Sequence, residues 1–333
     1  MFYSTSTEAC KLDIVRDKTI NVNGRSPRIN AIKSADNNLI ILGSSYLKGN
    51  HGLWIAKYDF AGNELFKKTL QIEEKGLSDF NVDAVVNAES ENILVLGNEY
   101  SSNYKIWLRK FDKKGNLIFK RLYSSEKSLS PGSIIRSDDG NYIITGTEDF
   151  KNVINIKIDN QGNELWRKIY ENNLHESLAL STTMNDKNIL GVSVAGKLSK
   201  FGTGDSNIKL TKYGSQGEKI KDIFFPGRVT DLSESITSDS TRNYYYLSYD
   251  SPAVVAGDVC NPSNVGENEI NVMKFNNSLE KIWNKPFGKK MLLIHSPLIN
   301  LIDDNFILAG SCNLTMSKIE PPWIFIIDKN GDK

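Results

Sequence analysis

The stretch VINIKIDNQGNELWRKIY, residues 153–170, decides the fold. An apolar run rich in isoleucine leads into Asp159, a turn containing Gly162, and a second run that ends in Ile-Tyr. β-Branched residues favour strands, and glycine can adopt the positive φ that a tight turn between two strands requires. The stretch therefore predicts a β-hairpin.

Similar hairpins recur along the chain, at successive separations of 53, 47, 55, 62 and 52 residues. The equivalents of Asp159 are Asp59, Asp112, Gly214, Asn276 and Asp328. A second pair of apolar runs precedes each hairpin, as in SIIRSDDGNYIITG, residues 133–146. Repeats of this length, each with four short strands, predict an all-β fold, a six-bladed β-propeller of four-stranded antiparallel blades.

The two ends of the chain carry complementary parts of this pattern. The last copy, WIFIIDKNGDK from Trp323, stops at its turn, whereas DIVRDKTI, residues 13–20, resembles the fourth strand NELFKKTL of the first copy. We expect residues 13–20 to complete the last blade and close the ring, which removes an exposed sheet edge. The alternative is that they form only an arm.

The repeats assign the whole chain, residues 1–333, to a single domain. We expect the six blades at 26–70, 78–123, 130–170, 175–225, 228–287 and 290–333, with the closing strand at 13–20.

Residues 153–170 resemble the bacterial propeller repeats that combine an apolar strand, Lys-x-Asp-x-x-Gly-Asn and an aromatic residue. The resemblance covers nearly the whole chain, but the fourth and fifth copies depart from it at Gly214 and at 276–279. It implies an architecture and no particular activity. Because many proteins with this repeat are exported or attached to the cell surface, it also implies a location outside the cytoplasm.

Composition argues against several classes of partner. The net charge of +1 disfavours capture of nucleic acid by bulk electrostatics. No run approaches the length of a membrane-spanning helix, and MFYSTSTEACKLD at the N-terminus lacks the features of a signal peptide. Three cysteines without CxxC spacing disfavour structural zinc, and no cofactor motif is present. We expect a monomer without a metal or cofactor.

In a four-stranded meander, the connections between second and third strands and those between blades lie on one face. Function is expected there, because long loops on a rigid scaffold commonly carry binding residues; the alternative is that the insertions are inert. The second-to-third connections expected to be long are residues 44–52, 193–207, 249–269 and 311–322.

Several polar residues map to this face. Around the innermost strands we expect Arg28, Asp79, Glu176 and Glu234, with Tyr249 and Asp250 in the fifth blade. The three histidines are His51 in a loop of the first blade, His175 and His295. A metal site needs convergent ligands, and these histidines are expected in nonadjacent blades, so isolated polar histidines are the favoured interpretation.

Two classes of function fit these residues. The favoured interpretation is a noncatalytic recognition module that binds a protein or a glycan. The alternative is a hydrolase or lyase with Tyr249, Asp250 and His295 at the channel mouth, since acid–base catalysis needs paired groups. We also expect Cys260 and Cys312, in loops of adjacent blades, to form a disulfide in an oxidising compartment; Cys10 is the less favoured partner, and three reduced thiols are the alternative.

Overall fold

A computed structural model describes sixteen segments of the chain. They are residues 25–35, 38–47, 50–59, 63–71, 77–86, 92–100, 102–171, 177–185, 188–196, 206–226, 235–250, 269–289, 293–302, 305–315, 318–319 and 323–331. Every regular element in these segments is a β-strand. The described part of the chain thus contains no helix long and apolar enough to cross a membrane.

The described strands form six antiparallel sheets, which we number in chain order. The first contains β1 (Arg25–Ala35), β2 (Asn38–Leu47), β3 (Asn50–Asp59) and β4 (Glu64–Gln71). The second contains β5 (Leu77–Val86), β6 (Ile93–Tyr100), β7 (Tyr104–Phe111) and β8 (Leu117–Tyr123). The third contains β9 (Leu129–Arg136), β10 (Tyr142–Glu148), β11 (Asn152–Ile158) and β12 (Glu164–Tyr170).

The remaining three sheets follow in the same way. The fourth contains β13 (Ser177–Asn185), β14 (Asn188–Gly196), β15 (Ser206–Tyr213) and β16 (Lys219–Pro226). The fifth contains β17 (Ser235–Ser238), β18 (Tyr244–Asp250), β19 (Glu269–Phe275) and β20 (Lys281–Lys289). The sixth contains β21 (Leu293–Ile302), β22 (Asn305–Thr315), β23 (Lys318–Ile319) and β24 (Trp323–Asp328).

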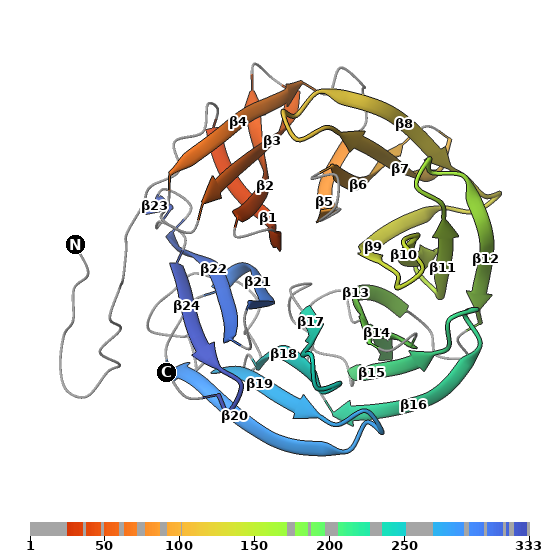
Figure 1. The fold of residues 1–333 in the computed structure, drawn as a ribbon, viewed down its shortest axis with the longest axis vertical. Helices are drawn as coiled ribbons and strands as arrows, with labels where there is room; N and C mark the ends of the chain where they lie inside the picture. Colours follow the sequence, from red (N-terminus) through yellow and green to blue (C-terminus); the bar gives the residue numbers. More distant parts are fainter. Residues whose placement is uncertain are drawn as a thin grey trace.

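The sheets are arranged radially around a centre, as in a β-propeller (Figure 1). The first strand of each sheet, which we call its inner strand, lies toward the centre, and the fourth strand of the first five sheets lies on the perimeter (Figure 1). Each inner strand contacts the inner strands of the neighbouring sheets, and β1 contacts β21. The first and sixth sheets are therefore neighbours in the ring.

The sixth sheet differs from the others. Strand β24 pairs with β22 and occupies the place that the third strand has elsewhere, while the two-residue strand β23 pairs with the far end of β22. The described residues contain no strand beyond β24 in this sheet. The expected partner, residues 13–20, lies outside the described residues.

Two of the expected long loops are largely strand. Strands β2 and β3 remain paired as far as Leu47 and Asn50, so that only residues 48–49 separate them. Likewise, β22 continues to Thr315 within the expected loop 311–322. These two expectations were wrong because backbone pairing between the strands extends beyond their apolar runs.

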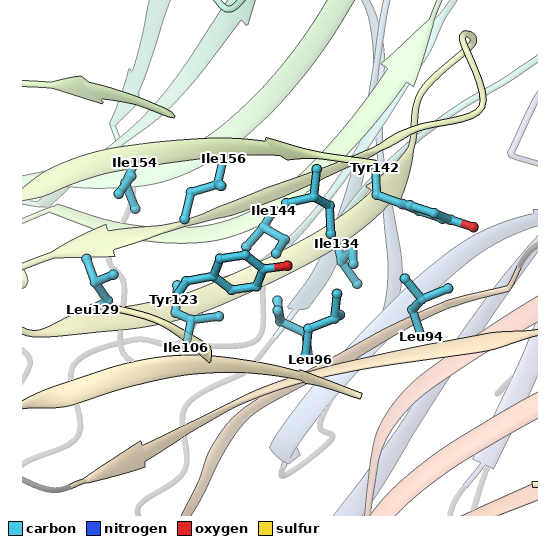
Figure 2. Packing of buried hydrophobic residues seen from close by; sticks show 12 residues of the cluster. Leu94, Leu96, Ile106, Tyr123, Leu129, Ile134, Tyr142, Ile144, Ile154 and Ile156 are labelled. Carbon is cyan, nitrogen blue, oxygen red and sulfur yellow. The ribbon is translucent and has the colours of Figure 1, made fainter. Parts of the chain in front are cut away.

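Apolar side chains pack between neighbouring sheets. Between the second and third sheets, leucine and isoleucine residues from both sides surround Tyr123 and Tyr142 (Figure 2). All seven residues of β11 are buried, as expected for a strand covered on both faces. Each fully buried Ile or Leu side chain contributes about 1.5–3 kcal/mol relative to leaving it exposed, so these interfaces hold the ring together.

The repeated turns owe their shape to a carboxylate and a glycine. One carboxylate oxygen of Asp159 accepts hydrogen bonds of 2.8 Å from the backbone N–H groups of Gln161 and Asn163. Gly162 has a φ of 78°, which confirms the predicted positive φ. Asp112 accepts the equivalent bonds in the second sheet.

The two divergent copies form the same turn with different groups. In the fifth sheet, the side-chain oxygen of Asn276 accepts 2.9 Å hydrogen bonds from the backbone N–H groups of Ser278 and Glu280. In the fourth sheet a Cβ on Gly214 would overlap the Glu218 carboxylate. That carboxylate accepts a hydrogen bond from the backbone of the turn and so replaces the missing aspartate.

Candidate functional site

One face of the ring gathers the ends of strands that are separated along the chain. In antiparallel sheets of this order, inner strands begin, second strands end and third strands begin at the same face. We call it the loop face, and we call the opposite one, which carries the turns of Asp112 and Asp159, the turn face. The loop face is where the connections between sheets lead to the centre.

The inner strands are irregular near the loop face. Among the described residues, five of the six inner-strand pairings contain register shifts, whereas the short pairing of β17 with β18 contains none. The shifts lie at Arg25/Arg28 and Ile29/Ala31, Ser78/Asp83, Thr145/Gly146, Ala179/Ser181, and Leu293/His295 and His295/Leu298. Register shifts of this kind are β-bulges, which change the direction of side chains and are frequent beside active sites.

Three expected site residues lie at these irregularities. Arg28 follows a register shift in β1, Asp79 lies within the shift of β5, and His295 lies between two shifts in β21. Because β1 contacts both β5 and β21, the three residues occupy adjacent inner strands. The structure thus places these three residues on adjacent inner strands, near the ends that lie at the loop face.

The placement of the histidines corrects the sequence interpretation. His51 was expected in a loop, but it lies in β3, opposite Tyr46. His51 and His295 were expected in nonadjacent blades, but the contact between β1 and β21 makes their sheets neighbours. His51 belongs to β3, however, and this third strand lies farther from the centre than the inner strand β21, which contains His295 (Figure 1). His175 lies outside the described residues.

The fifth sheet contributes two acidic residues in register. Tyr249 and Asp250 end β18, where Asp250 lies opposite Glu269 of β19 and Tyr249 opposite Ile270. The expected loop 249–269 therefore begins and ends in paired strand, and its interior, 251–268, lies outside the described residues. Glu269 was not among the expected site residues, because only the strand register places it beside Asp250.

The other expected residues are not brought into this site. Glu176 and Glu234 lie outside the described residues, as do Cys10 and Cys260. Cys312 lies in β22, opposite Leu293, and not in a loop as expected. The pairing of Cys260 with Cys312 stays a prediction. Within the described residues, no group of three His, Cys, Asp or Glu side chains could hold a metal ion.

Carboxyl groups with lowered pKa values are found among the described turns. Burial acts to raise the pKa of Asp139, but hydrogen bonds from Lys157, at 2.6 Å, and from Ser137 hold it below its ordinary value. The pKa of Asp159 is also lowered, because hydrogen bonds from Asn163 outweigh the effect of burial, which acts to raise it. These groups are structural, because they bond to residues of their own turns and, for Asp139, to Lys157 of β11.

No family model matches this chain, and no curated protein matches it. A solved Penicillium chrysogenum alpha-L-arabinanase, complexed with arabinobiose, is 9% identical with a TM-score of 0.58 over 95% of this chain and 96% of that chain. A Fusarium graminearum alpha-L-arabinofuranosidase with an iminosugar inhibitor is 8% identical with a TM-score of 0.56 over 91% and 92%.

A protein of unknown function from Bacteroides caccae is 12% identical, with a TM-score of 0.53 over 84% of this chain and 87% of that chain. At these identities the likeness establishes the β-propeller fold alone. It does not identify the bacterial repeat family that the sequence resembles.

The comparisons overturn the favoured interpretation of function. A noncatalytic recognition module was the favoured interpretation of the sequence, but two of the similar propellers are an arabinanase and an arabinofuranosidase. These comparisons contradict that interpretation and favour the hydrolase alternative over it.

Proposed function

We propose that this protein is a hydrolase that cleaves glycosidic bonds at the centre of its loop face. The observation that carries the proposal is the set of adjacent bulged inner strands bearing Arg28, Asp79 and His295. The enzymatic character of two propellers of similar fold, an arabinanase and an arabinofuranosidase, supports the choice of a carbohydrate substrate.

Most glycoside hydrolases use two carboxyl groups that flank the scissile bond. The proposal assigns Asp79 of β5 as one and Asp250, at the end of β18, as the other. One protonates the leaving oxygen while the other acts as nucleophile or activates water, and their separation sets the stereochemistry of the product. Arg28 and His295 are assigned to hydrogen bonding with substrate hydroxyls.

A hydrolysis screen tests the proposed class. Purified protein is incubated with chromogenic α- and β-glycosides, including α-L-arabinofuranosides, and with arabinan and other polysaccharides, and new reducing ends are measured. Release of sugar that is absent from a heat-inactivated sample supports the proposal. Failure to cleave any substrate in a screen where a reference arabinanase is active would contradict it.

The finer architecture is part of the proposal. The ring is assigned six blades in a single domain over residues 1–333, closed by residues 13–20 pairing with β24. The place of β24 as the outermost described strand of the sixth sheet supports this closure. A single cooperative unfolding transition is expected, and two separated transitions would count against one domain.

The proposed setting is outside the cytoplasm, where the chain acts as a monomer on a glycan. An oxidising compartment would permit the disulfide between Cys260 and Cys312. Nonreducing peptide mapping of protein made under oxidising conditions tests the bridge, and free thiols at both positions would exclude it.

A further inference from the structure

The third sheet carries a polar pair in its core. Thr145 of β10 and Asn155 of β11 lie directly opposite each other and are 1% and 0% exposed. The Thr145 hydroxyl donates a 2.8 Å hydrogen bond to the side-chain oxygen of Asn155. The other five sheets have apolar pairs at this position: Leu42/Ile55, Leu96/Leu108, Val192/Leu210, Leu247/Val272 and Ala309/Ile324.

The hydrogen-bonding capacity of this pair is not exhausted. Within the described part of the chain, the buried Nδ2 of Asn155 has no hydrogen-bond partner. The same holds for the hydroxyl of Ser133, which lies opposite Thr145 on β9. A buried polar group without a partner is destabilising, so two such groups on either side of Thr145 need an explanation.

Further polar groups of the third and fourth sheets lie in the same region. Tyr170 of β12 packs on Tyr213 of β15 with ring centroids 4.6 Å apart, and its hydroxyl donates to the Gly217 backbone oxygen. Both rings belong to the cluster of Ile143 and Ile189 between the two sheets, and burial raises the pKa of Tyr170 to about 12. Thr211 has a buried hydroxyl without a partner among the described residues.

We propose that ordered water binds between the third and fourth sheets, in a polar seam formed by Ser133, Thr145, Asn155, Tyr170, Thr211 and Tyr213. Water suits the seam because it can accept from the Asn155 amide and also exchange hydrogen bonds with the serine and threonine hydroxyls. Buried waters characteristically make two to four such bonds to otherwise unsatisfied groups. The seam runs across the third and fourth sheets, from Ser133 on the inner strand β9 to Tyr170 on β12, and those two sheets carry none of Arg28, Asp79 and His295.

The interface on the other side of the third sheet makes the contrast clear. There, Ile144, Ile154 and Ile156 pack against Leu96 and Ile106 of the second sheet (Figure 2). Thr145 and Asn155 alternate with these isoleucines along β10 and β11 and thus face the fourth sheet, where they lie beside the apolar cluster of Ile143, Ile189 and Tyr213.

A crystal structure of the wild-type protein tests the proposal directly. The expected result is ordered water density within hydrogen-bonding distance of the Asn155 Nδ2 atom. A seam whose side chains close on one another with no water between them would overturn the proposal.

A double variant gives an independent test. The change Thr145→Val with Asn155→Leu copies the Val192/Leu210 pair of the fourth sheet. If water fills the seam, the variant leaves that water among apolar groups without hydrogen-bond partners. Its Tm then falls below that of wild type. If the seam is dry, removal of unsatisfied groups raises the Tm.

Ile143→Val, at the same interface, serves as the control for loss of packing alone. A double-variant Tm that falls no further than that of Ile143→Val contradicts the proposal. If the double variant fails to fold, the wild-type crystal structure decides.

Discussion

The Tyr123 hydroxyl of the second sheet donates a 2.8 Å hydrogen bond to the backbone oxygen of Gly162 in the turn of the third sheet. Tyr170 makes the same contact with Gly217 one sheet farther on. A Cβ on Gly162 would also crowd the side chain of Arg121 on β8. The repeated tyrosine and glycine thus join neighbouring sheets.

Tyr123→Phe should weaken this contact between the second and third sheets. Because the change leaves the Gly162 carbonyl oxygen without its buried donor, we expect the free energy of unfolding to fall by about 1–2 kcal/mol. Denaturant titration measures it. Leu122→Ala, at a neighbouring residue that is 44% exposed, should change the free energy by no more than about 0.5 kcal/mol. Equal effects of both substitutions would show that the hydrogen bond contributes nothing.

Gly97→Ala should also destabilise the protein. A Cβ at Gly97 would overlap the indole of Trp107, whose Nε1 donates a 3.0 Å hydrogen bond to the Asn98 backbone oxygen. Overpacking of this kind costs about 1–3 kcal/mol. Gly191→Ala is the matched control, since its nearest neighbour, Tyr213, lies at 3.5 Å. The Tm of Gly97→Ala should therefore be lower than that of Gly191→Ala. Similar Tm values of the two variants would refute the steric explanation.

The fold was largely predictable because its determinants are local. The turn of Asp159 and Gly162 and the period of the apolar runs are visible in the sequence, and the structure forms that turn even where Gly214 replaces the aspartate. Loop lengths were harder to predict. The hairpin from Tyr46 to His51 stays paired through polar residues, which carry no periodic apolar signal.

Acid should weaken the turn of Asp239. Burial acts to raise the pKa of this carboxyl, but hydrogen bonds from Tyr245, at 2.7 Å, and from Asn243 and Thr241 hold it below its ordinary value. The pKa of Asp239 is lower in the folded than in the unfolded protein. The Asp239 carboxylate therefore stabilises the fold fully at pH values above the unfolded pKa of about 3.9. This stabilisation is lost as the pH falls through the folded-state pKa.

The substitution Asp239→Asn isolates this effect. At pH 7 it should lower the free energy of unfolding by about 1–3 kcal/mol, since it removes charge-assisted hydrogen bonds. The difference from wild type should shrink toward pH 3. Glu126→Gln, at an exposed carboxyl residue between the second and third sheets, is the control. A difference that does not change with pH would show that the charge is unimportant.

Closure of the ring predicts a strong effect of truncation. Deletion of residues 1–20 should expose the outer edge of β24 and lower the Tm or promote association, because an unpaired edge invites pairing with another chain. Deletion of residues 1–10 alone keeps the proposed closing strand and should change neither property. If the longer truncation melts like the intact protein and stays monomeric, residues 13–20 do not close the ring.

The site was only partly predictable. Arg28, Asp79 and His295 could be selected because each lies near the start of an inner strand, but their adjacency depends on the contacts that β1 makes with both β5 and β21. Glu269 was missed because its proximity to Asp250 arises from pairing across a long insertion. Such long-range register leaves no local pattern in a single sequence.

The most direct test of the proposed hydrolase is the rate of glycoside cleavage by Asp79→Asn, beside Glu126→Gln as a control. Glu126 is an exposed carboxyl residue between the second and third sheets, on the same face. Loss of a catalytic carboxyl should lower kcat by at least about 100-fold with the fold intact by circular dichroism, whereas the control should retain wild-type kcat. Wild-type kcat in Asp79→Asn, on a substrate that the protein cleaves, would contradict the assignment of Asp79 and the placement of the active site.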